Sequence, residues 1–210
     1  MKKILLTLVF GILIFSCSST KTANDKTKYF DENNVEISQL KFNQIQSKRE
    51  YLAIAGDSSH HRKLVVREKR GKITNRVFLE SLLEEQTNQE IDANQPIIII
   101  YYPGKDRCNS SSSATKQSRK SWYGQLEDGI HQTAPTQPIY IYKDKNGLEI
   151  YHDVLTWHKD PEGAVETLFF PDHYACSSFV VISKNGDYIS HFGEFGKESV
   201  WKATAQLINK

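Results

Sequence analysis

The stretch that decides the fold is Pro96-Ile-Ile-Ile-Ile-Tyr-Tyr-Pro-Gly-Lys-Asp-Arg-Cys108. From Ile97 to Tyr102 it is an unbroken apolar and aromatic run rich in β-branched side chains. Such a run predicts a strand that is buried on both faces, as in the middle of an α/β sheet. Pro96 introduces the strand, and a loop is expected from Gly104 through the serines at 110–113.

Helical and strand patterns alternate along the chain around this strand. Thr74 or Asn75 is expected to cap a helix that ends near Asn88, and a second helix is expected from about 112 to 131, with Trp122, Leu126 and Ile130 on one face. The apolar stripe of the first helix is predicted to be Val77, Phe78, Leu82 and Leu83. The later expected elements are strands at 139–143 and 148–151, and a helix that opens at 161–163 and has Val165, Leu168 and Phe169 as its apolar residues. A hairpin of strands 179–183 and 188–192 follows, and then a terminal amphipathic helix with Val200, Ala203, Leu207 and Ile208.

The region before these elements reads as β-rich. Residues 29–42 predict two short strands around an Asp-Glu-Asn-Asn turn, and strands are expected at 50–55 and 64–67. The basic run from Arg62 to Lys72 contains two valines and one glutamate, which favours a solvated strand or helix edge. We therefore expect an N-terminal β-rich extension over residues 29–73 and the main domain over residues 74–210.

The first residues predict export and a lipid anchor. A basic start at Lys2 and Lys3 precedes a mostly apolar run from Ile4 to Phe15, which is too short to span a bilayer about 30 Å thick. The run ends at Ser16-Cys17 and is similar to the signal of a bacterial lipoprotein. Residues 1–16 are then the signal peptide, Cys17 carries the lipid, and residues 17–28 form a flexible tether. A plain signal peptide or an uncleaved anchor are the alternatives.

This signal bears on the chemistry of the remaining cysteines. The chain has three, so use of Cys17 for lipid leaves Cys108 and Cys176. An oxidising compartment and a leftover pair suggest a disulfide. Such a bond would close a loop with 67 residues between its ends, which stabilises a fold by about 4 kcal/mol.

From residue 76 onward the element order resembles the thioredoxin fold. Cys108 follows the central strand and precedes a helix, where that family keeps its reactive thiol. The segment Cys108-Asn-Ser-Ser111 is similar to CxxS, a one-thiol version of the family's CxxC. Cys176-Ser177-Ser178 enters the last hairpin, where the family has its cis-proline loop. The resemblance implies a thioredoxin-like three-layer α/β sandwich in which the two cysteines lie within disulfide reach.

The sequence departs from that family in ways that matter for activity. Asp106-Arg107 replaces the usual tryptophan, Ser111 replaces the second cysteine, and Ser177 or Ser178 stands at the cis-proline position. Exchange through a CxxC dithiol is therefore excluded. Either the two cysteines form a structural disulfide, or Cys108 is a thiolate at a helix N-terminus, supported by Arg107, with Cys176 as resolving partner. The missing family residues favour the structural interpretation.

Other enzyme classes find less support in the sequence. Tyr101-Tyr102-Pro103 is similar to the entry to a peroxiredoxin cysteine, but Lys105 stands where that family needs threonine or serine, and Arg119 is the last arginine. The seven histidines form no HExxH pair, so neither a metal nor a cofactor is predicted.

Charge and composition exclude one further class of partner. The chain has 27 basic and 25 acidic residues, and the two basic residues of the signal peptide would leave with it. The mature chain is then formally neutral, whereas a nucleic-acid binder normally has a basic excess. The sequence predicts a lipoprotein of the cell envelope that binds the membrane through Cys17 and an envelope protein through a thioredoxin-like scaffold. An envelope thiol–disulfide oxidoreductase is the alternative.

Overall fold

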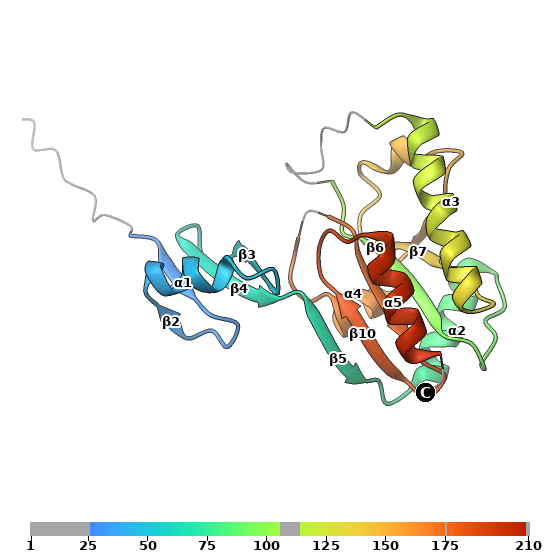
Figure 1. Ribbon diagram of the computed structural model, residues 1–210, viewed down its shortest axis with the longest axis horizontal. Helices are drawn as coiled ribbons and strands as arrows, with labels where there is room; N and C mark the ends of the chain where they lie inside the picture. Colours follow the sequence, from blue (N-terminus) through green and yellow to red (C-terminus); the bar gives the residue numbers. More distant parts are fainter. Residues whose placement is uncertain (1–25, 106–113, 175, 209–210) are drawn as a thin grey trace, which may run out of the picture.

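Two mixed β-sheets organise the chain. The computed structural model describes residues 26–105, 114–174 and 176–208. The larger sheet has six strands in the order β5-β10-β9-β6-β7-β8, and the smaller has four in the order β2-β1-β4-β3. Figure 1 shows the smaller sheet in a separate lobe, joined to the larger lobe by the ribbon that runs from β4 into β5. The α/β class expected from the sequence is confirmed.

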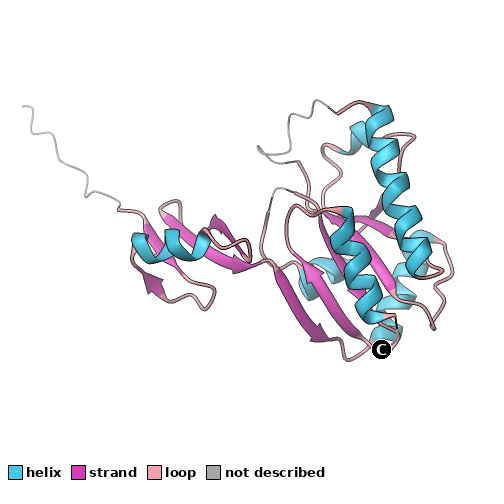
Figure 2. Cartoon of the chain, viewed as in Figure 1, coloured by secondary structure: helices cyan, strands magenta, loops and turns pink. Residues whose placement is uncertain are grey.

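The described elements agree closely with the expected order (Figure 2). The small lobe contains β1 (Lys28–Phe30), β2 (Glu36–Ile37), α1 (Gln39–Gln46), β3 (Tyr51–Ala55) and β4 (His61–Val66). The large lobe contains β5 (Glu68–Lys72), α2 (Arg76–Thr87), β6 (Ile97–Tyr102), α3 (Lys116–Thr133), β7 (Ile139–Tyr142), η1 (Leu148–Tyr151), β8 (His158–Lys159), η2 (Pro161–Gly163), α4 (Ala164–Phe169), β9 (Ser178–Ile182), β10 (Asp187–His191) and α5 (Lys197–Leu207).

The central strand β6 divides the large lobe into two cores. All six of its residues are buried, as the apolar run predicts. Ile97, Ile99 and Tyr101 pack on one face of the sheet with α2 and α4, whereas Ile98 and Ile100 pack on the other with α3 and α5. Successive side chains of a strand point to opposite faces. An uninterrupted apolar strand is therefore needed to supply both cores.

Helices α2 and α3 begin at polar side chains. Asn75 Oδ1 accepts a hydrogen bond from Phe78 N at 3.0 Å and caps α2. Thr115 Oγ1 accepts one from Ser118 N at 3.1 Å and caps α3. Each bond satisfies one of the N–H groups that a first helical turn leaves without an intrahelical partner.

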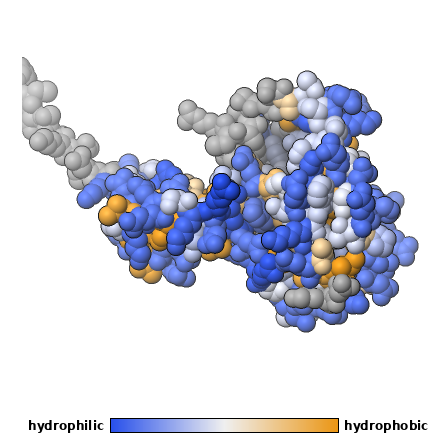
Figure 3. Space-filling view, viewed as in Figure 1, coloured by the Kyte–Doolittle hydropathy of each residue, from blue (hydrophilic) through white to orange (hydrophobic). Residues whose placement is uncertain are grey.

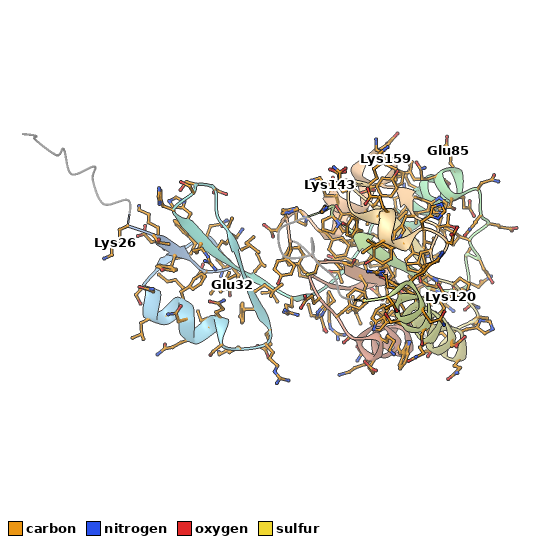
Figure 4. The ribbon with its side chains drawn as sticks, turned by 90° about the horizontal axis from the view of Figure 1, so that it is seen from above. Lys26, Glu32, Glu85, Lys120, Lys143 and Lys159 are labelled. Carbon is orange, nitrogen blue, oxygen red and sulfur yellow. The ribbon has the colours of Figure 1, made fainter. Side chains whose placement is uncertain are left out.

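The small lobe has its own apolar centre. Helix α1 lies on one face of the four-stranded sheet, where Phe42 is 2% exposed and its ring lies 4.9 Å from that of Tyr29. Leu64 is also fully buried there. Seen from above in Figure 4, Lys26 lies at the end of this lobe that points away from the large lobe.

Four local expectations are wrong. Residues 148–151 form a 3-10 turn instead of a strand, and residues 39–42 begin α1 instead of lying in a strand. In α2, Val77 and Phe78 are exposed, although they were expected in the buried stripe. In α4, Leu168, expected on the apolar side, is also exposed. Within the described part of the chain, no helix is both long and apolar enough to cross a membrane.

Candidate functional site

Two regions of the large lobe are candidate sites. The first is the end of the sheet where β6 stops and β9 starts, which we call the β6–β9 end. The register pairs Tyr101 with Ser178, so the segment that leads to Cys108 and the segment that contains Cys176 leave the sheet at the same end. Of the expected site residues, Cys17, Arg107, Cys108 and Ser111 lie outside the described residues, whereas Cys176 and Ser177 are described.

Glu194 lies at the centre of the described part of the β6–β9 end. The thiol of half-buried Cys176 donates to Glu194 Oε1 at 3.2 Å. The carbonyl of Glu194 accepts from Arg67 Nη1 at 3.0 Å and lies 3.3 Å from His191 Nε2. A thiol that donates carries its proton, whereas attack on a disulfide needs the thiolate. The hydrogen bond to Glu194 ties the segment before β9 to the loop that follows β10.

Ser177 and Ser178 differ in their surroundings. Ser178 is buried, and its Oγ accepts a hydrogen bond from Gly193 N at 2.9 Å. This bond ties the start of β9 to the loop that follows β10. Ser177 is half-buried at the same strand entry. Ser178 is thus a structural link between the two loops.

Aromatic rings surround this end on the α3 and α5 side. The His191 ring stacks on Phe179, with centroids 5.5 Å apart and an interplanar angle of 8°. Phe179 also meets Phe195 at 5.0 Å, and Phe195 meets Trp122 at 6.2 Å. Burial lowers the pKa of His191 and outweighs its hydrogen bond to Glu194, which acts in the opposite direction. Burial of the ring therefore favours the neutral form of His191.

The small lobe contacts the same end of the sheet. Leu52 and Val65 join the core that contains Phe192, and the chain turns at Gly193 with φ +81°. A Cβ at Gly193 would lie 2.8 Å from both Leu52 Cδ1 and the Tyr174 ring. Glycine is needed here both for its positive φ and for this close approach.

The second region lies between α2 and α4, and we call it the α2–α4 groove. It has a volume of about 520 Å³. Its apolar lining includes Phe78, Leu82, Ala164, Leu168 and Tyr188. Its polar lining includes Lys72, Thr74, Asn75, Glu162 and Thr167. The volume falls in the range of about 300–1,000 Å³ that is usual for ligand pockets.

The orientation of α2 explains why this groove is apolar. The helix buries an ion pair between Arg76 and Glu80, which are 8% and 7% exposed. Arg76 also donates to the carbonyls of Ala93 at 3.0 Å and Gln95 at 2.7 Å. Burial lowers the pKa of Arg76 and raises that of Glu80, and each partner's charge opposes this shift in the other.

The same orientation leaves apolar side chains in contact with water. Val77 is 70% exposed and Phe78 is 55% exposed, and Leu168 of α4 is 47% exposed. Phe78, Leu82 and Leu168 line the groove, and we call these three residues its apolar surface. Adjacent exposed apolar residues with polar neighbours are typical of interaction sites. Sequence periodicity placed these residues in the core, so it could not reveal the surface.

Within the described residues no group of histidine, cysteine, aspartate and glutamate side chains is arranged to hold a metal ion. Comparison with known proteins gives no match to this chain: no family model, no curated protein and no solved structure.

Proposed function

We propose that this chain is a cell-envelope lipoprotein whose large lobe is a thioredoxin-like, non-enzymatic binding module. The strand order β7-β6-β9-β10 supports the fold proposal, because β6 and β7 are parallel and β9 and β10 are antiparallel neighbours. Helix α3 connects the parallel pair and α5 follows the hairpin. The resemblance rests on this order along the chain, in which a helix lies between two strands and a hairpin precedes the last helix.

The observation that carries the binding proposal is the apolar surface of the α2–α4 groove. Helix α2 buries a charged pair and leaves Val77 and Phe78 in water, which is the reverse of the usual preference. The occupant we propose is a short apolar segment of another envelope protein. Its apolar side chains would contact Phe78 and Leu168, and its polar flanks would meet polar residues of the groove such as Thr74 and Glu162.

Site-specific photo-crosslinking in the intact envelope tests this surface. A photoreactive residue at Phe78 or Leu168 should give the same discrete adduct, whereas one at Leu40, which is 70% exposed in the small lobe, should not. The purified partner should then bind Phe78→Asp at least about tenfold more weakly, since burial of such a side chain contributes about 1.5–3 kcal/mol. Leu40→Asp should bind normally. A partner that binds Phe78→Asp as well as the unaltered protein would refute the proposed surface.

The membrane anchor has a separate test. The full chain with Cys17→Ser should no longer be found in the membrane fraction. Mass spectrometry of the unaltered protein should find that Cys17 is the N-terminal residue and is acylated. Ser18→Ala is a control because it keeps both Cys17 and the small residue before it. If the unaltered protein carried no lipid at Cys17 and still sedimented with membranes, the lipoprotein proposal would be wrong.

A second candidate function is thiol–disulfide exchange. The pairing of Tyr101 with Ser178 favours it, because both cysteine segments leave the sheet at the same end. A catalytic bond between Cys108 and Cys176 should open in a mild thiol buffer, at a potential above about −300 mV. A structural bond should resist reduction. Cys108→Ser should abolish reductase or isomerase activity without unfolding if the bond is catalytic, and should only lower stability if it is structural.

A further inference from the structure

A single nearly continuous strand passes through both sheets. Strand β4 ends at Val66 and β5 begins at Glu68, with only Arg67 between them. Arg67 N donates to Glu50 O at 2.8 Å, and Arg67 O accepts from Phe192 N at 2.7 Å. Both backbone groups of one residue point to the same edge of a strand. Glu50, just before β3, and Phe192, just after β10, are therefore bonded to the same edge of the continuous strand. The sheet order places β5 at the end of the six-stranded sheet, so its opposite edge is open in the described chain.

The register shows which backbone groups this open edge presents. Ile73 N donates to Gly186 O at 2.9 Å, so residue 73, like residue 67, bonds toward β10. Hydrogen-bonded and non-hydrogen-bonded pairs alternate in an antiparallel ladder. Lys69 and Gly71 therefore also bond toward β10, while the N–H and C=O groups of Glu68, Arg70 and Lys72 point outward. All five residues of β5 are exposed.

The side chains of β5 differ between its two faces. On one face, the ring of Tyr188 covers Gly71, and a Cβ at this position would lie 2.7 Å from Tyr188 Oη. On the other face lie Arg70 and Lys72, with Glu68 bound to Arg70 at 2.7 Å. Lys69 and Lys72 make no ion pair with another described residue. In Figure 3, hydrophilic side chains cover the region of β5.

We propose that the open edge of β5 accepts an extended segment of another protein by strand addition, and that this segment alternates acidic with apolar residues. Outward backbone groups provide the affinity in this binding mode, and alternate side chains provide the specificity. The acidic side chains would lie beside Arg70 and Lys72, and the apolar ones beside Tyr188. Basic side chains on this edge oppose pairing with a second copy of the same chain.

Amide exchange distinguishes strand addition from simple charge attraction. The probe is a short peptide that alternates glutamate with valine, and the control peptide has lysine in place of glutamate. With the full chain in detergent, the first peptide should abolish fast exchange at the amides of Glu68, Arg70 and Lys72. The already bonded amides of Lys69 and Gly71 should not change. Binding of the glutamate peptide without this pattern, or no binding at all, would overturn the proposal.

Two variants test the same edge without relying on exchange rates. Arg70→Pro removes one outward N–H and keeps the inward bonds, a change that edge strands tolerate. It should lose peptide binding, whereas Arg70→Gln, which lacks the same charge but keeps the N–H, should retain part of it. Should the proline variant fail to fold, Lys72→Glu keeps the backbone intact and should weaken binding of the glutamate peptide. Unchanged binding by Lys72→Glu would contradict the proposed acidic occupant.

Discussion

The two faces of the six-stranded sheet are packed in different ways. On the α3 and α5 face, Trp201 Nε1 donates to Leu126 O at 3.0 Å, and its indole lies directly against Gly129. On the α2 and α4 face, a charged pair is buried while Val77 and Phe78 remain exposed beside a groove of about 520 Å³. One face has closed packing between its helices, and the other keeps apolar area available.

This difference separates stability from binding within one domain. Closed packing gives each substitution a large cost, because neighbouring atoms leave no room for adjustment. An exposed apolar surface contributes little to folding, so its residues are free to serve a partner. The following predictions test this division of roles, from the largest expected effect to the smallest.

The buried ion pair should be the most sensitive feature of the α2 and α4 face. Arg76→Met leaves the Glu80 carboxylate buried without its partner, which costs about 3–5 kcal/mol. Chemical denaturation measures the loss of unfolding free energy. The double variant Arg76→Met/Glu80→Leu removes both charges and should recover part of this loss, because the carbonyls of Ala93 and Gln95 still lack their donor. If the double variant were as unstable as the single one, the ion pair would not be what stabilises this orientation of α2.

A matched pair of truncations compares the two faces directly. Leu126→Ala removes a fully buried side chain of α3 and should cost about 2–5 kcal/mol. Phe78→Ala removes a larger side chain, yet it should change the unfolding free energy by no more than about 0.5 kcal/mol, because Phe78 is mostly exposed. Urea unfolding of both variants provides the comparison. Similar losses at the two positions would show that the faces do not differ.

Two glycines of α3 test how closely α3 and α5 are packed. Gly129→Ala would place a Cβ inside the indole of Trp201 and should cost about 1–3 kcal/mol. Gly124→Ala meets no atom within 4 Å and should raise stability by about 0.5–1 kcal/mol, since alanine favours a helix more than glycine does. Thermal unfolding of the two variants should therefore shift in opposite directions. Stabilisation by both would mean that α5 is free to move away from α3.

The smallest effect is a pH dependence at the edge of the closed face. Burial lowers the pKa of His191 below the value of about 6.5 that it has in an unfolded chain. Between the two pKa values, the unfolded state therefore binds more protons than the folded state. The free energy of unfolding decreases as the pH falls through about 6.5 toward the folded-state pKa. Unfolding at several pH values should show this slope, and His191→Phe should remove it while keeping the stack on Phe179. If the pH dependence of stability were unchanged in His191→Phe, it would come from other titratable groups.

Much of the fold could be predicted from local patterns. Ile97–Tyr102 is apolar without interruption, and the Lys184-Asn185-Gly186-Asp187 turn separates two apolar runs, so β6 and the β9–β10 hairpin follow from short-range signals. Helix α2 and its Asn75 cap could be predicted for the same reason. The expected strand at 148–151 is wrong because these residues form a 3-10 turn, in which the ring of Tyr151 contacts Trp157.

The residues that meet at the candidate sites could not be predicted as well from the sequence. Glu194 lies 18 residues beyond Cys176, on a loop that the hairpin brings back to the same end of the sheet. The short Gly193-Glu-Phe-Gly196 segment between the hairpin and the last helix was the available signal. No periodic pattern relates these two positions, because their contact depends on strand register.

The sequence by itself determined the class of fold, the order of the main helices and strands of the large lobe and the buried central strand, since periodicity and turn residues act over a few positions. Only the tertiary structure decided which face of α2 is buried. Arg76 is held by the carbonyls of Ala93 and Gln95, which lie 17 and 19 residues further along the chain. These hydrogen bonds and the ion pair with Glu80 stabilise the polar face inside the lobe, and Val77 and Phe78 are consequently left in water.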